Sequence, residues 1–447
     1  MKTNNRLRFI LFLTGILLAT HLLNAQSQDQ NYIIDRTFKD SIRSQTNIQY
    51  YDGLGRPSEL LQLNASPEGK HLIVFNEYDG LGREAKQWLP YPCVPYNNYY
   101  IPIDIIKEEM PAIYNDEKPY LLNEYEPSPL NRFSKQYDPG MIWQNSERGV
   151  STEYLSCQSA IAEYSCRYYE VENFSNDTVV HLLPKSVNCT NMFNITIREG
   201  EDNTKTLTFT NGRGQKILTR QVAENIFYDT YYIYDDYGNL RVVLPPVASD
   251  SLDTTANEPE SVNKILSKYA YLYQFDARNR CIAKKLPGCE WIYYVYDSAD
   301  RLIFTQDGVQ RNRGEWMFTI PDMEGRVCMK GICRNDLRVW NNPLKTSVVT
   351  AVKATDGQQG SGYDVTGTSL SSPVLLETDY YDDYSFLDIP LLSPHKASLL
   401  GERHVAAFSS LSSAIPHDLL TGTVYMHLHN DTTVSCNCTV SKLLRCS

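Results

Sequence analysis

The sequence predicts an all-β protein assembled from antiparallel β-hairpin repeats. A degenerate hexad, Tyr-Asp-x-x-Gly-Arg, recurs between residues 51 and 326, and a recurring short unit is the signature of a repeat architecture. Tyrosine dominates the aromatic residues, with 32 Tyr against 14 Phe, which suits strands with one wet face. Between residues 164 and 222, short β-branched and aromatic runs alternate with Asn, Asp and Gly clusters, which is typical of strands joined by turns.

Seven copies of the hexad are recognisable, two of them complete and five degenerate. The positions that we interpret as structural repeat turns are Tyr51, Asp52, Gly55 and Arg56; Tyr78, Asp79, Gly82 and Arg83; Gly214; Tyr234, Asp235 and Gly238; Phe275, Asp276, Asn279 and Arg280; Tyr296, Asp297, Asp300 and Arg301; and Asp322, Gly325 and Arg326.

The fifth hexad position explains why each copy should be a turn. It holds Gly in five copies, with Asn279 and Asp300 in the other two. Gly, Asn and Asp are the residues that adopt a positive φ at modest cost. The aromatic residue before the turn favours a strand, and the Asp side chain can bond backbone amides across the turn. Each hexad is therefore predicted to be the tip of a β-hairpin.

The amino terminus has the pattern of a secretory signal peptide over residues 1–25. Lys2, Arg6 and Arg8 precede an apolar run at residues 9–23, and cleavage after Ala25 is expected. The run is shorter than the ~20 apolar residues of a spanning helix, so an uncleaved anchor is the second choice. We expect export to the cell surface, the periplasm or the medium, with no later membrane span.

Residues 26–150 are predicted to form an amino-terminal domain with two hexad hairpins. A proline-rich connector at 88–95 should break the strand ladder, because proline lacks an amide donor. A short helix is expected at 103–110, before Pro111, and an extended segment with turns at 124–143.

The rest of the chain is predicted to form three regions. Residues 151–228 should be an irregular β region, and residues 229–345 a hexad repeat region with an acidic loop and a helix at 250–273. Residues 346–447 should be a loop-rich tail with a mobile surface loop at 353–372. Within this tail, residues 380–384 are expected to form a last aromatic strand.

Charge and cysteine usage exclude some classes of function. The net charge is -11, with 42 Lys and Arg against 53 Asp and Glu, so no nucleic-acid partner is expected. Eleven cysteines are scattered along the chain. We expect mostly buried structural cysteines, although the pairs 157/166, 281/289 and 328/333 are close enough in sequence for a bridge.

No catalytic, cofactor-binding or metal site is predicted. The hexad aspartates could be imagined as general acids, but a residue type repeated at the same turn position serves the repeat. His427 and His429 with Cys436 and Cys438 are the residues that come nearest to a zinc pattern, and their spacing is unfamiliar. The sequence shows no nucleophile elbow, phosphate-binding loop or dinucleotide fingerprint.

These hexads resemble the Rhs/YD-repeat family, which includes bacterial polymorphic-toxin shells and the extracellular shells of teneurins. Residues 126–132, 229–246, 285–290 and 295–297 are similar to the amino-terminal part of large secreted Rhs-type proteins that open with a domain of unknown function. The resemblance covers roughly residues 33–422.

The resemblance implies a spiralling, open β-sheet that encloses a hollow, with short helices and long loops, and a non-enzymatic structural or encapsulating role. The family's core region and effector are not found here, so we expect a gene truncated or frameshifted near Met426. An open sheet edge should then bind the rest of such a shell, another surface protein or a second copy. Two alternatives stay open: an adhesion or carbohydrate-binding module, and a hydrolase of surface polymers.

Overall fold

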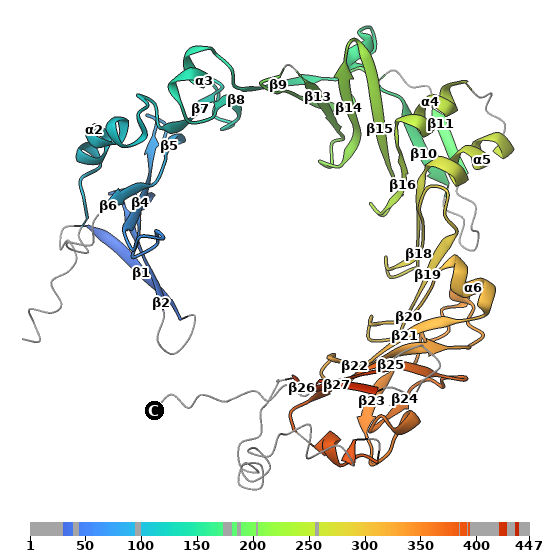
Figure 1. Ribbon diagram of the computed structural model, residues 1–447. Coiled ribbons are helices and arrows are strands. Elements are labelled where there is room, and N and C mark those ends of the chain that lie inside the picture. Colours follow the sequence, from blue (N-terminus) through green and yellow to red (C-terminus); the bar gives the residue numbers. More distant parts are fainter. Residues whose placement is uncertain are drawn as a thin grey trace, which may run out of the picture. The chain divides into compact units, whose positions relative to one another are not determined.

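The computed structural model describes residues 30–38, 44–93, 100–172, 181–185, 189–202, 204–254, 259–383, 385–390, 392–393, 420–426 and 434–437. Antiparallel strands dominate these residues and the helices are short, which confirms the all-β prediction (Figure 1). The contacts divide the chain into two compact units. The first comprises residues 1–165, 190–215 and 219–228, and the second comprises 166–189, 216–218 and 229–447.

The first unit is a meander of antiparallel strands. Its strands are β1 (Asn31–Phe38), β2 (Ser44–Tyr51), β3 (Pro57–Gln62), β4 (His71–Tyr78), β5 (Glu84–Trp88), β6 (Tyr91–Cys93), β7 (Tyr120–Tyr125), β8 (Phe133–Tyr137), β9 (Val150–Ser156), β12 (Asn194–Glu199) and β13 (Lys205–Thr210). The strands from β1 to β4 pair consecutively, and the two halves of β4 pair with β5 and β6. The ladder then continues through β5, β7, β8, β9, β12 and β13.

The core of this unit lies on one face of β2, β3 and β4. The pairing brings Ile48, Leu61 and Ile73 into one row across the three strands, and all three are buried. Helix α2 (Ile103–Tyr114) adds Ile106 and Met110 to the same cluster. Every second side chain of these strands therefore points toward one face of helix α2. In this way the antiparallel sheet buries one of its two faces.

The second unit is a longer meander. Its main strands are β15 (Ile226–Tyr234), β16 (Leu240–Leu244), β17 (Tyr271–Phe275), β18 (Cys281–Lys285), β19 (Trp291–Tyr296), β20 (Leu302–Gln306), β21 (Trp316–Pro321), β22 (Val327–Cys333), β25 (Val374–Tyr381), β26 (Leu420–Met426) and β27 (Val434–Asn437). Each pairs antiparallel with the next. Two separate hairpins, β10 (Tyr168–Glu172) with β11 (His181–Lys185) and β23 (Thr350–Lys353) with β24 (Tyr363–Thr366), stand beside it. The unit boundary runs along the chain through β14 (Lys216–Ala223) and β15.

The remaining elements are short helices. They are α3 (Met141–Asn145), α4 (Pro246–Thr254), α5 (Pro259–Tyr269) and α6 (Gly308–Arg313), with single 3-10 turns η1 (Ala162–Tyr164), η2 (Val339–Asn341), η3 (Gln358–Gly360) and η4 (Ser385–Asp388). Helix α6 begins with a capping box, in which Asp307 accepts the amide of Gln310 and the Gln310 side chain accepts the amide of Asp307. None of the helices in the described ranges has the length and apolar character needed to cross a membrane.

The predicted helix at 103–110 ends too early, because α2 continues through Pro111 to Tyr114. Proline lacks one amide donor, and that loss falls near the end of this helix. The helix stops at Asn115, which has a φ of 50° and whose amide bonds the carbonyl of Pro111. The C-terminal cap, rather than the proline, ends the helix.

Two other boundaries are also corrected. The proline-rich connector contains β6, a short strand that pairs with the first half of β4. The acidic loop expected from Asp250 lies largely within α4, which starts at Pro246. Proline suits the first helical position, since its fixed φ matches a helix and its missing amide has no partner there.

The segment 353–372, predicted to be a mobile surface loop, contains strand β24 and the turn that joins it to β23. Strands β23 and β24 form a paired hairpin, and Val349, Ala351 and Tyr363 are buried in the core of the second unit. Packing of these apolar residues overrides the Gly- and Ser-rich composition. The aromatic strand expected at 380–384 corresponds to the end of β25.

Several predictions on the chain ends lie outside the described residues. These include the signal peptide at 1–25, His427, His429 and Cys438. Within the predicted loop-rich tail, β26 pairs with β25 and with β27.

Candidate functional site

The hexad turns share one hydrogen-bonding pattern, shown here by the first copy. One carboxylate oxygen of Asp52 accepts the backbone amides of Leu54 and Arg56, both at 2.9 Å. The other oxygen accepts Nε of Arg56 at 2.7 Å, and the amide of Gly55 bonds the carbonyl of Asp52 at 3.0 Å. One side chain thus satisfies the polar groups that a five-residue turn leaves unpaired.

The other hexads repeat this pattern at the position of Asp52. Asp79, Asp276, Asp297 and Asp322 repeat the bond to the arginine four residues later, Asp235 uses Asn239, and Asn211 replaces Asp in the copy around Gly214. Every fifth position has a positive φ: Gly55 77°, Gly82 79°, Gly214 76°, Gly238 88°, Asn279 59°, Asp300 61° and Gly325 89°. In five copies the strand register shifts immediately before the aromatic residue of the hexad, as at a β-bulge.

The two glycines of the first hexad test this conformation. Gly55 has a φ of 77° whereas the φ of Gly53 is not positive, and a Cβ at either position meets no atom within 4 Å. Gly55→Ala is expected to lower the free energy of unfolding by about 1 kcal/mol, because an L side chain is strained at that φ. Gly53→Ala is the matched control and should have little effect in thermal denaturation. Equal losses would show that the left-handed backbone does not decide the effect.

Each hexad arginine also reaches the next hairpin. Continuing the β3–β4 register from the pair Glu59↔Phe75 brings Arg56 opposite Tyr78, and its guanidinium lies 4.3 Å from the centre of that ring. The same placement sets Arg83 over Tyr125 at 4.4 Å. The second unit repeats it with Arg280 over Tyr296 at 5.1 Å and Arg326 over Tyr381 at 4.7 Å. We call this series of cation–π contacts the arginine–aromatic ladder.

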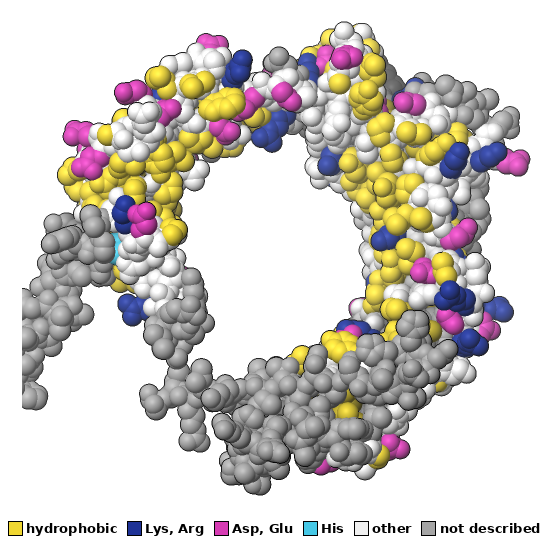
Figure 2. Space-filling model, in the orientation of Figure 1, with side chains coloured by type: hydrophobic (Ala, Val, Ile, Leu, Met, Phe, Trp, Pro, Cys, Tyr) yellow, Lys and Arg dark blue, Asp and Glu magenta, His cyan; other side chains and the backbone are white. Residues whose placement is uncertain are grey.

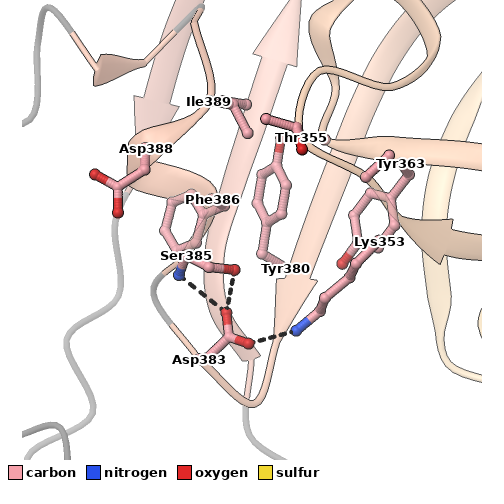
Figure 3. A pocket seen from close by; sticks show the side chains of 11 residues that line it. Lys353, Thr355, Tyr363, Tyr380, Asp383, Ser385, Phe386, Asp388 and Ile389 are labelled. Carbon is pink, nitrogen blue, oxygen red and sulfur yellow. Dashed lines mark hydrogen bonds and ion pairs between the residues drawn. The ribbon is translucent and has the colours of Figure 1, made fainter.

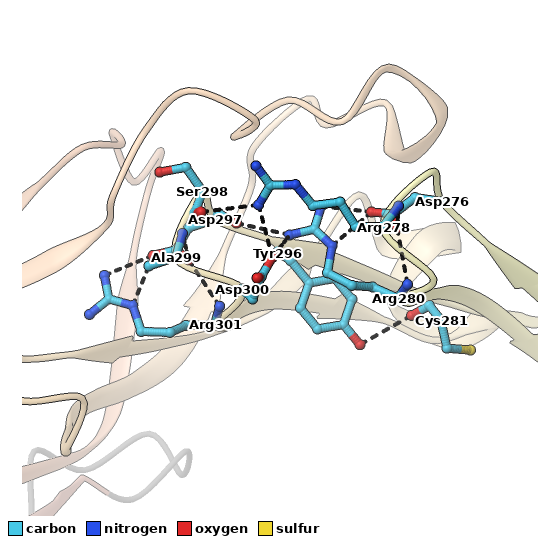
Figure 4. A network of polar contacts seen from close by, with 10 residues as sticks. All are labelled: Asp276, Arg278, Arg280, Cys281, Tyr296, Asp297, Ser298, Ala299, Asp300 and Arg301. Atoms are coloured by element: carbon cyan, nitrogen blue, oxygen red, sulfur yellow. Dashed lines mark hydrogen bonds and ion pairs between the residues drawn. The ribbon is translucent and has the colours of Figure 1, made fainter.

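Figure 4 shows one step of the ladder in the second unit. Nη1 of Arg280 donates to the backbone carbonyl of Asp297 at 3.0 Å and lies 2.9 Å from the carboxylate of Asp300. Arg278 reaches the same Asp300 oxygen at 3.0 Å. The following turn is the most buried, because the Asp297 side chain is 0 % exposed. Arg280 therefore bonds both the aspartate of its own turn and the backbone of the following turn.

Some steps lack an arginine or a ring, and at two of them the structure replaces the contact. Asn239 stands where Phe275 would receive an arginine, and its amide bonds Asp235 and Asn279 instead. Pro321 stands where Arg301 would find a ring, and Arg301 donates to the carbonyls of Asp322 at 3.0 Å and Val349 at 2.6 Å. Each ladder contact therefore depends on the residues that the strand register sets opposite each other.

Restoring the first of these steps tests the ladder. Asn239→Arg should raise the free energy of unfolding by about 0.5–1 kcal/mol, since a guanidinium would lie over Phe275. Asn239→Gln is the control, because it keeps an amide and supplies no cation. Thermal denaturation of both variants compares them directly. A gain that is the same for Gln and Arg would contradict the cation–π explanation.

Sequence reasoning missed two ladder members. Tyr125 precedes a longer turn in which the amide of Glu126 bonds the carbonyl of Arg132, and Arg132 in turn covers Tyr154 at 4.7 Å. Tyr381 precedes Asp382, which forms a bidentate pair with Arg326 at 2.7 and 2.9 Å. The detectable signal is an aromatic–acidic pair at the end of a strand, because the spacing to the next arginine varies.

The hexad aspartates are committed to the turns. Bonds from the backbone amide and side chain of Arg56 hold the pKa of Asp52 below its usual value, and Arg83 does the same for Asp79. Burial alone would raise the pKa of Asp297, but bonds from Arg301 and from the amide of Val349 outweigh it and lower the pKa. A carboxylate kept ionised by its own turn is poorly suited to donate a proton.

A cavity of about 330 Å³ lies near the end of β25 (Figure 3). Tyr363, Tyr380 and Phe386 stack behind it with ring centroids 5.5 and 4.4 Å apart, and all three are buried. At the mouth, Asp383 bonds Lys353 at 2.8 Å and the hydroxyl of Ser385 at 2.6 Å. The rings stack on one another and the carboxylate of Asp383 is already paired. We therefore interpret this cavity as part of the packing of the unit rather than as a binding site.

A second cavity, of about 570 Å³, lies between helix α6 and the segment around η2. Tyr293 and Trp340 are half-buried in its wall, with ring centroids 6.0 Å apart at 76°. The guanidinium of Arg311 stacks 4.5 Å from the centre of Tyr293 and donates to the carbonyl of Trp291. A cavity of this size with rings and a fixed polar group fits a small organic ligand.

Other predicted site features are placed as follows. Cys281 with Cys289, and Cys328 with Cys333, are free thiols rather than bridges. Burial raises the pKa of both Cys328 and Cys333 to about 11, so neither is a ready nucleophile. On the face in Figure 2, basic and acidic side chains are interspersed.

Comparisons with known proteins add a family match for part of the chain. Residues 24–156 match a domain of unknown function, DUF6443. No curated protein matches the chain. Among solved structures, the chain is similar to TcdB2-TccC3-Cdc42 with a TM-score of 0.45 and 12% identity, over 89% of this chain and 15% of that one.

Two further structures give similar values. The Photorhabdus luminescens Tc holotoxin pore carrying the TccC3 mutation D651A has a TM-score of 0.43 and 12% identity, over 89% of this chain and 15% of that one. TcdB2-TccC3 has a TM-score of 0.43 and 13% identity, over 90% and 18%. The chain therefore spans less than a fifth of the length of these solved chains.

Proposed function

We propose that this chain is an exported, non-enzymatic β-repeat protein that forms the amino-terminal segment of an Rhs-type shell and has a structural or encapsulating role. The observation that supports it is the shared chemistry of the turns. Their aspartates and arginines are used within and between hairpins, at the same positions in both units. Aspartates and arginines that bond each other and the backbone in this way stabilise a long sheet and do not form a reaction centre.

Isolation of the protein from fractionated cells tests this role. We expect mass spectrometry to find a mature chain that starts at Gln26 in an exported fraction. We also expect it to co-purify with polypeptide that carries further Tyr-Asp hexads and becomes protease-sensitive when this chain is removed. A product confined to the cytoplasm, or one that purifies without such a polypeptide, would contradict the proposal.

The cavity beside Arg311 favours carbohydrate binding as a second candidate function. Half-exposed Tyr293 and Trp340 offer ring surfaces, and a guanidinium fixed beside them can bind sugar oxygens. A glycan array should then show binding that Trp340→Ala reduces at least tenfold. Trp143→Ala, at a 37 % exposed tryptophan of the other unit, is the matched control. Equal loss in both variants would exclude this cavity.

A further inference from the structure

Among the described residues, β1 is an edge strand with little of the usual protection. Its described pairings are with β2 alone, over eight consecutive residues without a bulge. Natural edge strands are commonly protected by Lys, Pro, bulges or short length. The strand has neither Lys nor Pro in its eight residues, and Asp35 and Arg36 are its charged residues. Its outer backbone groups are therefore a template for another strand.

The side chains of β1 continue the core face of the first unit into solvent. Tyr32 lies opposite Tyr50, and Ile34 lies opposite Ile48. Their partners are 0 % and 1 % exposed, whereas Tyr32 is 37 % and Ile34 is 43 % exposed. The other face of the strand carries Ile33, which is 59 % exposed. An apolar surface thus accompanies the outer edge of β1 on both faces.

We propose that β1 pairs antiparallel with β1 of a second copy of this chain, with Ile34 opposite Ile34 of the copy. A two-fold axis perpendicular to a sheet keeps each side chain on its own face. A residue then lies opposite itself or opposite one an even number of positions away. Centring the pair on Asp35 or on Arg36 would set like charges against each other, which is unfavourable.

Centring on Ile34 is favoured by charge and shape. It places Arg36 opposite Tyr32 of the copy, on the face of the core. That is the contact that the arginine–aromatic ladder makes between neighbouring strands within the chain. Ile34 meets its own copy at the centre, so two exposed side chains bury each other. The pairing extends the sheet of the first unit by that of its partner.

Sedimentation of the leader-processed chain over a concentration series tests the proposal. We expect a reversible dimer for the natural sequence and for Leu54→Lys, which adds the same charge at a 79 % exposed turn residue away from the edge. Ile34→Lys should raise the dissociation constant at least tenfold, because it sets two charges together at the centre. A monomer at every concentration, or an Ile34→Lys dimer of unchanged affinity, would overturn the proposal.

Cross-linking provides a second test that does not rely on a charged variant. Residues directly opposite in an antiparallel pair have Cα atoms about 4.5–5.5 Å apart, which suits a disulfide. Ile34→Cys should form a cross-linked dimer under mild oxidation, beyond any seen for the natural sequence, and Leu54→Cys should not. Absence of the Ile34→Cys dimer would overturn the register. The inference is independent of the shell role, which a monomeric chain would leave intact.

Discussion

Replacing Glu59 with glutamine should raise the free energy of unfolding of the first unit by about 3 kcal/mol at pH 7. Glu59 lies on β3 between Tyr50 of β2 and Phe75 of β4, and it is 1 % exposed. Neither carboxyl oxygen has a hydrogen-bond partner of good geometry within the described ranges, although the amide of Ile101 lies nearby. Burying an unpaired carboxylate is strongly unfavourable, so the folded protein holds this group as the neutral acid.

The pH dependence follows from the same environment. Burial raises the pKa of Glu59 from 4.5 to about 8, and the nearby amide of Ile101 offsets only part of this. Between these two values the folded chain keeps a proton that the unfolded chain releases. The stabilising effect of the neutral acid is therefore complete below pH 4.5 and is lost as the pH rises through 8. Glutamine has no proton to lose, so the advantage of the variant should grow across this window.

Urea unfolding at pH 5 and pH 7 measures the effect, with hydrogen exchange of β3 peptides assigning the transition. The natural chain should lose roughly 2 kcal/mol of stability between these two pH values relative to Glu59→Gln. Glu124→Gln is the control, because Glu124 is an exposed carboxylate on β7 of the same unit. If Glu59→Gln follows the same pH curve as the natural chain, the carboxyl is not held neutral in the folded state.

Asp297→Ala should lower the free energy of unfolding of the second unit by about 3–5 kcal/mol. The Asp297 side chain is fully buried and accepts bonds from the amides of Ala299, Arg301 and Val349 and from the guanidinium of Arg301. Removing it leaves three amides without an acceptor and takes the carboxylate away from Arg301, which keeps the carbonyls of Asp322 and Val349. Water has little access to this turn, so the donors stay unsatisfied.

Asp52→Ala is the matched variant, since it removes the same carboxylate from an open copy of the turn. The Asp52 side chain is 25 % exposed, so water can solvate the donors that it leaves. Its effect should be much smaller. Urea denaturation of the two variants makes the comparison, with circular dichroism to confirm that both fold. Losses of equal size would mean that burial does not set the strength of these turns.

The turns were predictable from sequence because their signal is local. A residue that tolerates positive φ, three positions after an Asp, defines the loop, and Asn279 and Asp300 take that conformation as Gly55 does. The contact between Arg56 and Tyr78 joins residues on neighbouring strands. It depends on the register of β3 and β4, which the hexad alone does not contain.

Burial accounts for the other differences. The hairpin of β23 and β24 has a loop-like composition, and packing of Tyr363 against Tyr380 fixes it. The buried state of Glu59 was equally hidden, because Leu60 and Leu61 are adjacent apolar residues and either parity would suit β3. Packing against helix α2 determines which face of β3 is buried.

The arginine–aromatic ladder has a consequence for how such a chain changes length. Each arginine contacts the hairpin that follows, so the coupling is between nearest neighbours, as in a one-dimensional array. A duplicated hairpin contains its own turn aspartate, and its arginine and aromatic residue can contact the hairpins on either side. After a deletion, the two flanking hairpins can make the same contacts with each other. Gene rearrangement can therefore lengthen or shorten the sheet in whole hairpins. Loss of one hairpin under mechanical tension should likewise leave the rest of the array folded.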